Sequence, residues 1–286
     1  MVDIANNSAS QMNALVYHSE EVAEYYASLN YLTAAERSLF EKFLRKGMEI
    51  LDLGVGGGRA TPYLSSIANR YLGVDYSSAM IDACKKKFPE LDFEVAAAED
   101  LSKLGSGTFD ALVMAFNAID YVFPEACRLR AIREIHRVLK PGGLFIFSSH
   151  NARSVLVRPS WNPARLRKMA ETIGSPDTHL FRAIHATLIT GRIVVAWLQA
   201  TGKTMTQAFK KLPRRTFWRG RGYLMDSAHG GLMTFFGTPS RIEHEFNRHG
   251  FRLLETLGDD YPLPSNLYVT DWYYYVFSKT EANVQK

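Results

Sequence analysis

The spacing of apolar and polar positions changes several times along the chain, and each change predicts a secondary-structure element. Thr33 and Glu36 fit a capping box, and the residues that follow are apolar at helical spacing up to Leu44, which predicts a helix. Met48–Leu53 is a nearly continuous apolar run, which is typical of a buried strand. Both patterns then alternate: strands are expected at 71–75, 91–96, 109–116 and 143–150, and helices from about 19 and at about 60–69, 78–88 and 125–139.

This alternation of strands and helices indicates an α/β fold with a doubly wound, mostly parallel sheet. The last part of the chain departs from it, because a helix at about 240–249 is followed by two strands, 251–258 and 267–279, with only a loop between them. Parallel neighbours need a crossover of a dozen or more residues, so these two strands must be antiparallel. We therefore expect a seven-stranded sheet that ends in an antiparallel hairpin.

The sheet does not need the residues between its fifth strand and the last helix, which predicts an insertion. We divide the chain into an N-terminal helical segment (1–47), a core (48–150), an inserted, largely helical lid (151–238) and a C-terminal part that completes the sheet (239–286). Positions 151–222 hold 14 Lys and Arg against two acidic residues, a formal charge of +12, whereas the whole chain carries +5. The lid therefore either attracts an anionic partner or is a solvated basic face.

The composition is that of a globular protein, with 47% apolar and 22% charged residues in 286. The longest apolar stretch, 184–198, is too short to span a bilayer, and the first residues lack the basic start and apolar core of a signal peptide. We therefore expect a cytoplasmic protein without a transmembrane segment. Cys84 and Cys127 do not have the spacing of a metal site, so no metal is expected. The oligomeric state is left open.

A glycine-rich stretch, ILDLGVGGGRA at 50–60, follows the first predicted strand. Glycine is unfavourable inside regular structure, so four glycines within five positions indicate the close approach of a ligand. No Gly-Lys-Ser or Gly-Lys-Thr follows, which excludes a phosphate-binding P-loop, and a dinucleotide motif would need a glycine where Arg59 stands. Asp75 ends the second strand 21 positions after Gly54, where an acidic residue can accept hydrogen bonds from a ribose. These residues predict a nucleoside cofactor, either NAD or S-adenosylmethionine.

Five segments taken together resemble a known family. After the glycine loop come GVDYSSAMI (73–81), AAAEDL (96–101), FDALVMAFNAIDYV (109–122) and REIHRVLKPGGLFIFSSHN (133–151). Their order and spacing are similar to those of the class I S-adenosylmethionine-dependent methyltransferases. The resemblance covers 49–151 well and 240–278 loosely, and it does not cover the predicted lid. It implies a Rossmann-like fold and S-adenosylmethionine as the cofactor.

The resemblance also implies roles for individual residues. The expected contacts are the backbone of Gly54, Gly56 and Gly58 at the methionine part of the cofactor, Asp75 at the ribose, Tyr76, Ala98 and Glu99 at the adenine, and Asn117 and Ala118 near the methionine part and the sulfur. Asp52 either takes part in this site or caps the glycine loop. Many relatives have an Asp where this chain has Ala97, which leaves the adenine contact to Glu99, to Asp100 or to the backbone. Tyr17, Tyr25 and Tyr26 either belong to the core or cover the sulfonium.

Methyl transfer from a sulfonium mainly needs a nucleophile held in line with the methyl carbon. A general base is required only when the acceptor must lose a proton, as a hydroxyl does. The candidates for this chemistry are residues expected at the mouth of the sheet or in the lid: His150, Asp120, Asp226 and His229. His150 ends the fifth strand, where the ligands of such sheets gather. Asp226 and His229 either activate a hydroxyl together or belong to a turn.

We predict methyl transfer to an oxygen of a small-molecule or saccharide-like acceptor, which the basic lid would recognise if the acceptor is anionic. A nucleic-acid acceptor is not expected, because methylation of base amines usually goes with a Pro-Pro-aromatic tetrad and this chain has Asn-Ala-Ile-Asp at 117–120. Methylation of an RNA ribose or of another anionic polymer is an alternative. A non-catalytic partner subunit that binds S-adenosylmethionine is another.

Overall fold

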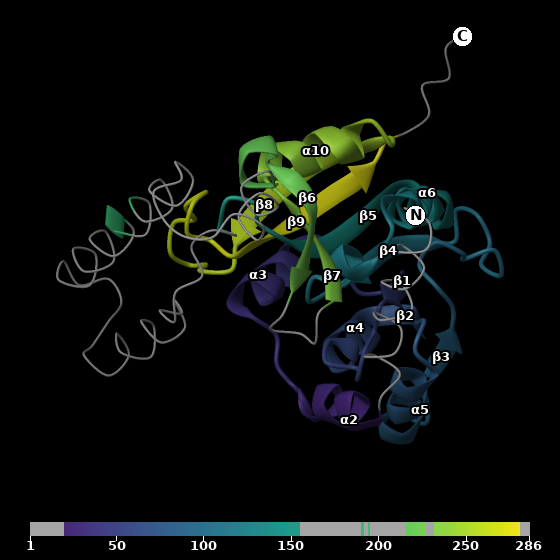
Figure 1. The fold of residues 1–286 in the computed structure, drawn as a ribbon. Coiled ribbons are helices and arrows are strands. Elements are labelled where there is room, and N and C mark those ends of the chain that lie inside the picture. Colours follow the sequence, from purple (N-terminus) through teal and green to yellow (C-terminus); the bar gives the residue numbers. More distant parts are fainter. Residues whose placement is uncertain (1–19, 155–189, 192–193, 195–215, 227–231, 281–286) are drawn as a thin grey trace, which may run out of the picture.

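The computed structural model describes residues 20–154, 190–191, 194, 216–226 and 232–280. In these ranges a seven-stranded sheet has the order β3-β2-β1-β4-β5-β9-β8, and β9 runs in the opposite direction to the other six strands (Figure 1). The strands are β1 (Met48–Leu53), β2 (Ala68–Asp75), β3 (Asp92–Val95), β4 (Phe109–Met114), β5 (Leu139–His150), β8 (Phe251–Gly258) and β9 (Trp272–Lys279). The predicted α/β fold with a C-terminal antiparallel hairpin is confirmed.

Helices cover both faces of this sheet. They are α2 (Glu20–Ser28), α3 (Ala34–Phe43), α4 (Thr61–Ile67), α5 (Ser78–Lys87), the 3₁₀ turn η1 (Ala118–Tyr121), α6 (Glu125–Val138) and α10 (Pro239–Asn247). Leu39, Leu64 and Ile81 bring α3, α4 and α5 to one face. Ile132 and Ile242 bring α6 and α10 to the other. None of the described helices is both long and apolar enough to cross a membrane.

The predicted capping box begins α3. The Thr33 hydroxyl accepts a hydrogen bond from the Glu36 N–H at 3.2 Å, and the Glu36 carboxylate accepts one from the Thr33 N–H at 2.9 Å. These two bonds satisfy backbone donors that the first helical turn leaves unpaired. Leu39 and Phe40 are completely or almost completely buried, so the amphipathic pattern placed the correct face of the helix on the sheet.

The aromatic strand β9 is buried on both sides. Tyr273 and Tyr275 belong to the core beneath α6 and α10, and Tyr274 and Val276 belong to the core beneath α3. The reason is the position of β9 between β5 and β8, because a strand in the interior of a sheet covered by helices has no solvent face.

Residues 221–237 differ from the expected helical insertion. Here β6 (Arg221–Asp226) and β7 (Leu232–Gly237) form an antiparallel pair, and β7 lies against β5 and η1 (Figure 1, green). Phe235 enters the core beneath α6, while Phe236 packs on the opposite side with Leu224 and Ala152. Because both sides of β7 are buried, its sequence lacks the alternation that predicts a strand. Most of 151–238 lies outside the described residues, so the lid stays a prediction.

Candidate active site

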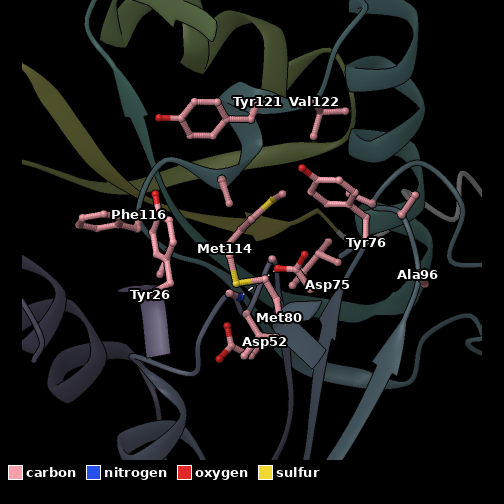
Figure 2. Close-up of a pocket in the computed structure, with 18 of the residues that line it drawn as sticks. Tyr26, Asp52, Asp75, Tyr76, Met80, Ala96, Met114, Phe116, Tyr121 and Val122 are labelled. Carbon is pink, nitrogen blue, oxygen red and sulfur yellow. Dashed lines mark hydrogen bonds between the residues drawn. The ribbon is translucent and has the colours of Figure 1, made fainter. Parts of the chain in front are cut away.

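A cavity of about 220 Å³ lies beyond the carboxyl ends of β1, β2 and β4 (Figure 2). This is the topological switch point of the sheet, where open α/β folds bind their ligands. Most of the residues expected to bind a cofactor line the cavity: Asp52, Gly54, Gly56, Asp75, Tyr76, Ala98, Glu99 and Ala118. Gly58 packs against the Phe88 ring instead, and Asn117 turns toward His150.

The loop after β1 is rich in glycine for two separate steric reasons. Gly54 has a φ of 70°, which glycine adopts without strain, and a Cβ there would lie 2.9 Å from the Cβ of Ala118. At Gly57 a Cβ would lie 2.2 Å from the backbone nitrogen of Ala27 and 2.3 Å from the carbonyl carbon of Tyr26. The first glycine therefore allows the turn toward η1, and the second allows the end of α2 to pack directly on the loop.

The carboxylate of Asp75 is held by backbone donors from two sides. Its Oδ2 accepts a hydrogen bond from the Gly56 N–H at 2.9 Å, and its Oδ1 accepts one from the Ser77 N–H, also at 2.9 Å. The carboxylate therefore joins the glycine loop to the start of α5 and has a defined position in the cavity wall. Tyr76 lies beside it in the same wall, and burial, with the charge of Asp75, raises the pKa of its phenol.

Asp52 is a buried carboxyl group at the opposite end of the cavity from Tyr121 (Figure 2). The Tyr71 hydroxyl donates to its Oδ2 at 2.9 Å and lies 2.7 Å from the Thr61 hydroxyl. Burial raises the pKa of Asp52 to about 7, although the Tyr71 hydrogen bond and the charge of Arg59 act in the opposite direction. At neutral pH this group is therefore divided between its acid and its carboxylate form.

Arg59 is a cavity residue that the sequence analysis used only as a departure from the dinucleotide motif. Its Nη1 and Nη2 donate to the two carboxylate oxygens of Glu36 at 2.8 and 2.5 Å, and Nη1 also donates to the Tyr31 carbonyl at 2.7 Å. Burial alone would lower the pKa of Arg59, but the Glu36 carboxylate raises it. The position of Arg59 directly after the glycines could have indicated a role at the site. Its partner Glu36 lies 23 positions earlier, so no local pattern connects the two residues.

The rest of the cavity wall is largely apolar. It includes Tyr26 from α2, Met80 from α5, Met114 from β4, and Phe116, Tyr121, Val122 and Phe123 from the segment after β4. In Figure 2 Met114 lies between the end with Asp52 and the end with Tyr121. Of the three tyrosines considered from the sequence, Tyr26 lines the cavity, Tyr25 is 63% exposed and Tyr17 lies outside the described residues.

Asp120 and His150, which the sequence suggested separately, form a buried pair. The Asp120 Oδ2 lies 2.8 Å from the His150 Nδ1 and accepts a hydrogen bond from the His150 backbone N–H at 2.6 Å. Its Oδ1 accepts one from the Ser149 hydroxyl at 2.7 Å. The 3₁₀ turn η1 makes this possible, because it carries Asp120 from the end of β4 to the end of β5. Asp120 is completely buried, and His150 is 8% exposed.

Aromatic side chains surround the His150 imidazole. The ring centroids of Phe236, Tyr121 and Trp272 lie 5.2, 6.2 and 6.4 Å from that of the imidazole. Because Tyr121 also lines the cavity, the Asp120–His150 pair lies beside the cavity at the Tyr121 end.

The other two catalytic candidates are not brought to this pair by any described contact. His229 lies outside the described residues, and Asp226 is the last residue of β6, opposite Leu232 in the hairpin. In the described ranges no group of three or more His, Cys, Asp and Glu side chains could hold a metal ion.

Residues 51–147 match a protein family described as "Methyltransferase domain". This match begins in β1, ends in β5 and includes the glycine loop, Asp75 and Asp120. Residues 51–147 of the chain therefore form a methyltransferase domain, as the resemblance to the class I S-adenosylmethionine-dependent methyltransferases implied. The expectation from the five sequence segments is thereby confirmed.

The methyltransferase domain is similar to curated proteins and to solved structures. A Mycolicibacterium smegmatis protein named "Probable S-adenosylmethionine-dependent methyltransferase" is 25% identical over 174 residues, which cover 57% of this chain and 66% of the relative. A fatty-acid O-methyltransferase of the same organism is 27% identical over 150 residues, which cover 51% and 50%. The chain thus spans about half to two thirds of the length of these relatives.

A solved structure supports the fold. An S-adenosylmethionine-dependent methyltransferase from Mesorhizobium loti superposes with a TM-score of 0.55 and 20% identity, covering 86% of this chain and 98% of that one. At this level of identity the likeness concerns the fold of the methyltransferase domain.

The cavity residues fit S-adenosylmethionine, the cofactor for which the Mycolicibacterium smegmatis relative is named. Gly56 lines the cavity, and a Cβ added there would meet none of the described residues within 4 Å, so the loop leaves a cradle of bare backbone. A carboxylate for ribose hydroxyls, Asp75, and an aromatic ring, Tyr76, lie in the adjoining wall. The cavity therefore offers the donor and acceptor groups that a nucleoside with an amino acid tail requires.

Proposed function

We propose that the protein transfers the methyl group of S-adenosylmethionine to an oxygen of a small acceptor, with His150 as the general base. The observation that carries this proposal is the buried pair of Asp120 and His150 beside the cavity. A hydroxyl is a poor nucleophile until it loses its proton, so an oxygen acceptor is the kind that needs such a base.

The cofactor would lie across the carboxyl ends of β1 and β2. Asp75 would accept hydrogen bonds from its ribose, the backbone at Gly54 and Gly56 would face its methionine part, and Tyr76 with Glu99 would face its adenine. When bound, S-adenosylmethionine supplies an electrophilic methyl group on a sulfonium, which leaves as a neutral thioether. The role of these residues is to hold that group in place and to exclude water.

The chemistry of His150 follows from the side of the ring that Asp120 occupies. A carboxylate accepts hydrogen bonds and cannot donate one, so its contact at 2.8 Å calls for a proton on Nδ1. In the neutral imidazole Nε2 then carries the lone pair. The acceptor's hydroxyl proton would pass to Nε2 as its oxygen forms the bond to the methyl carbon, and Asp120 would stabilise the resulting imidazolium.

The acceptor would enter at the end of the cavity formed by Tyr121, Val122 and Phe123. These side chains favour a molecule with an apolar or aromatic surface next to its hydroxyl group. Curated relatives are named for methylation of oxygen as well as of carbon, so the support for an oxygen acceptor comes from the pair beside the cavity and not from the relatives. A negatively charged or saccharide-like part of the acceptor would face the basic residues predicted in the lid.

The test is turnover with labelled cofactor. The purified full-length protein is incubated with methyl-labelled S-adenosylmethionine and fractions of a small-molecule extract, and mass spectrometry identifies the labelled product. We expect a methyl ether or a methyl ester. A label on nitrogen or carbon would contradict the oxygen assignment, and binding of the cofactor without turnover in any fraction would point to the non-catalytic subunit.

The base is tested in the same assay with His150→Gln. We expect transfer to fall about 10²- to 10⁴-fold while the affinity for S-adenosylhomocysteine in calorimetry stays the same. His136→Gln is the matched control. His136 is a residue of α6 that packs against Phe251 of β8, and it lies outside the cavity wall. Equal rates in the two variants would show that His150 is not the base.

A further inference from the structure

Two consecutive residues after β4 have backbone conformations that side-chain-bearing residues seldom adopt. Phe116 has a φ of 57° and Asn117 a φ of 61°, both in the left-handed region. Such conformations cost free energy and persist where the surrounding structure requires them, often at functional sites.

The turn places neighbouring side chains on different sides of the cavity wall. Phe116 and Ala118 line the cavity, whereas Asn117 does not. The Asn117 N–H donates to the Ser148 hydroxyl at 2.8 Å, and its side-chain Nδ2 lies 3.3 Å from the Nε2 of His150. With 7% of its surface exposed, Asn117 is more than nine-tenths buried. The unusual backbone therefore delivers an amide group to the ring nitrogen that Asp120 does not contact.

The amide nitrogen of Asn117 can only donate a hydrogen bond, so Nε2 must accept one. We propose that Asn117 is a positioning residue for His150: it donates to Nε2, which keeps that nitrogen unprotonated and ready for the acceptor's proton. This inference rests on the proposed function. Asp120 and Asn117 then act on opposite sides of the ring, one accepting from Nδ1 and the other donating to Nε2.

The two contacts have opposite effects on the charge of the ring. A buried carboxylate at Nδ1 favours the doubly protonated imidazolium, which is inactive as a base. A donor at Nε2 opposes that protonation. The other groups packed against the ring are the Tyr121 phenol on η1, the Phe236 ring on β7 and the Trp272 ring on β9, and none of these is a charged side chain at neutral pH. Asn117 is thus the group that balances Asp120 among the described neighbours of the ring.

The carbonyl end of the same amide explains how the acceptor can take the place of Asn117. Its Oδ1 is buried and has no hydrogen-bond partner within the described part of the chain. The side-chain amide is therefore held at Nε2 by a single contact at 3.3 Å, which is long for a hydrogen bond. An acceptor hydroxyl group that reaches Nε2 therefore has to displace this one weak hydrogen bond from Asn117.

The experiment uses two variants that both tolerate the left-handed backbone, Asn117→Asp and Asn117→Gly. The full-length protein is labelled with ¹⁵N-histidine, and the signals of His150 among the eight histidines are those lost in His150→Gln. The ¹⁵N shifts report which ring nitrogen carries a proton, and a pH titration gives the midpoint of double protonation. Neither measurement requires an acceptor or turnover.

In the unsubstituted protein we expect a proton on Nδ1 and none on Nε2 at neutral pH. In Asn117→Asp the new carboxylate favours the imidazolium, so the titration midpoint rises by about 1 to 3 pH units. In Asn117→Gly it rises less, because a donor is lost and no charge is added. A proton on Nε2 in the unsubstituted protein, or identical midpoints in all three proteins, would overturn the inference.

Two further readouts separate this inference from its alternatives. The acidic limb of the kcat/KM profile should move to higher pH in Asn117→Asp, by the same amount as the NMR midpoint. Calorimetry with S-adenosylhomocysteine should give equal affinities for all three proteins, and a loss of affinity in Asn117→Gly would place the side chain on the cofactor instead. If no acceptor is ever methylated but the NMR result holds, the proposed function fails and the positioning of His150 stands.

Discussion

The guanidinium of Arg59, directly after the glycine loop, forms a buried two-point ion pair with the carboxylate of Glu36, at 2.8 and 2.5 Å. Glu36 is also the residue that completes the capping box of α3. One carboxylate therefore starts the helix and binds the end of the cofactor loop. This relationship connects the N-terminal segment with the cavity wall.

We expect Glu36→Gln to lower the free energy of unfolding by about 3–5 kcal/mol, because it leaves the buried Arg59 charge without its partner. The measurement is urea unfolding of the full chain. Glu41→Gln is the matched control, since Glu41 pairs with Arg37 on the exposed face of the same helix and such pairs contribute about 0–1 kcal/mol. Equal losses of unfolding free energy in the two variants would mean that the buried pair stabilises the protein no more than the exposed pair does.

Gly57→Ala should displace the end of α2 from the cofactor loop, because the added Cβ would lie 2.2 Å from the Ala27 nitrogen. Tyr26 lines the cavity from this end of α2, so we expect the affinity for S-adenosylhomocysteine to fall at least about tenfold, or about 1.4 kcal/mol, in calorimetry. Gly191→Ala is the control, since a Cβ at Gly191 would meet no atom of the described residues within 4 Å. An unchanged affinity in Gly57→Ala would show that α2 does not shape the cofactor site.

Asp52 predicts a pH dependence of stability with a defined sign. Its pKa is about 7 in the folded protein against 3.8 ordinarily, so the folded state binds the proton more tightly than the unfolded state. The stability linked to this group is complete below about pH 4 and is lost as the pH rises toward 7. Asp52→Asn should remove that loss, so its melting temperature should rise relative to the unsubstituted protein between pH 4 and 7 and stay level above.

Asp110→Asn is the control for this experiment because its expected sign is opposite. Burial works against the charge of Asp110, but the Glu49 N–H and the Lys140 ammonium outweigh it and lower the pKa of Asp110. Its carboxylate therefore stabilises the protein above the ordinary pKa of 3.8, and Asp110→Asn should be relatively less stable at neutral pH than in acid. The same trend in both variants would contradict the assignment for Asp52.

Asp120→Asn should reduce methyl transfer about 10²- to 10⁴-fold, because the variant can no longer stabilise the imidazolium and can present an N–H to Nδ1. Binding of S-adenosylhomocysteine, measured by calorimetry, should be retained because Asp120 does not line the cavity. Retained binding also shows that the variant is folded. Asp92→Asn, an exposed substitution at the start of β3, should leave the rate unchanged. A full rate in Asp120→Asn would contradict the role of the pair.

The parts of the fold that were predictable depend on short-range patterns. The capping box at Thr33 and Glu36, the boundaries of β1 and β8, and the glycine loop all follow from residues within a few positions of one another. The hairpin of β6 and β7 was missed because Phe235 and Phe236 are buried on opposite sides, which removes the polar alternation of a surface strand. Both faces of β9 are buried as well, because this strand lies between β5 and β8 in the sheet.

By itself the sequence determined the order of strands and helices in the seven-stranded sheet and the presence of a nucleoside site, because periodicity and glycine spacing report on local backbone geometry. The residues that give the site its chemistry were assembled only by the tertiary structure. Arg59 meets Glu36 from 23 positions away. His150 meets Asp120 from 30 positions away, because β4 and β5 are neighbours in the sheet and η1 turns back over β5. Such meetings depend on strand order and on the turns between strands, which no local pattern encodes.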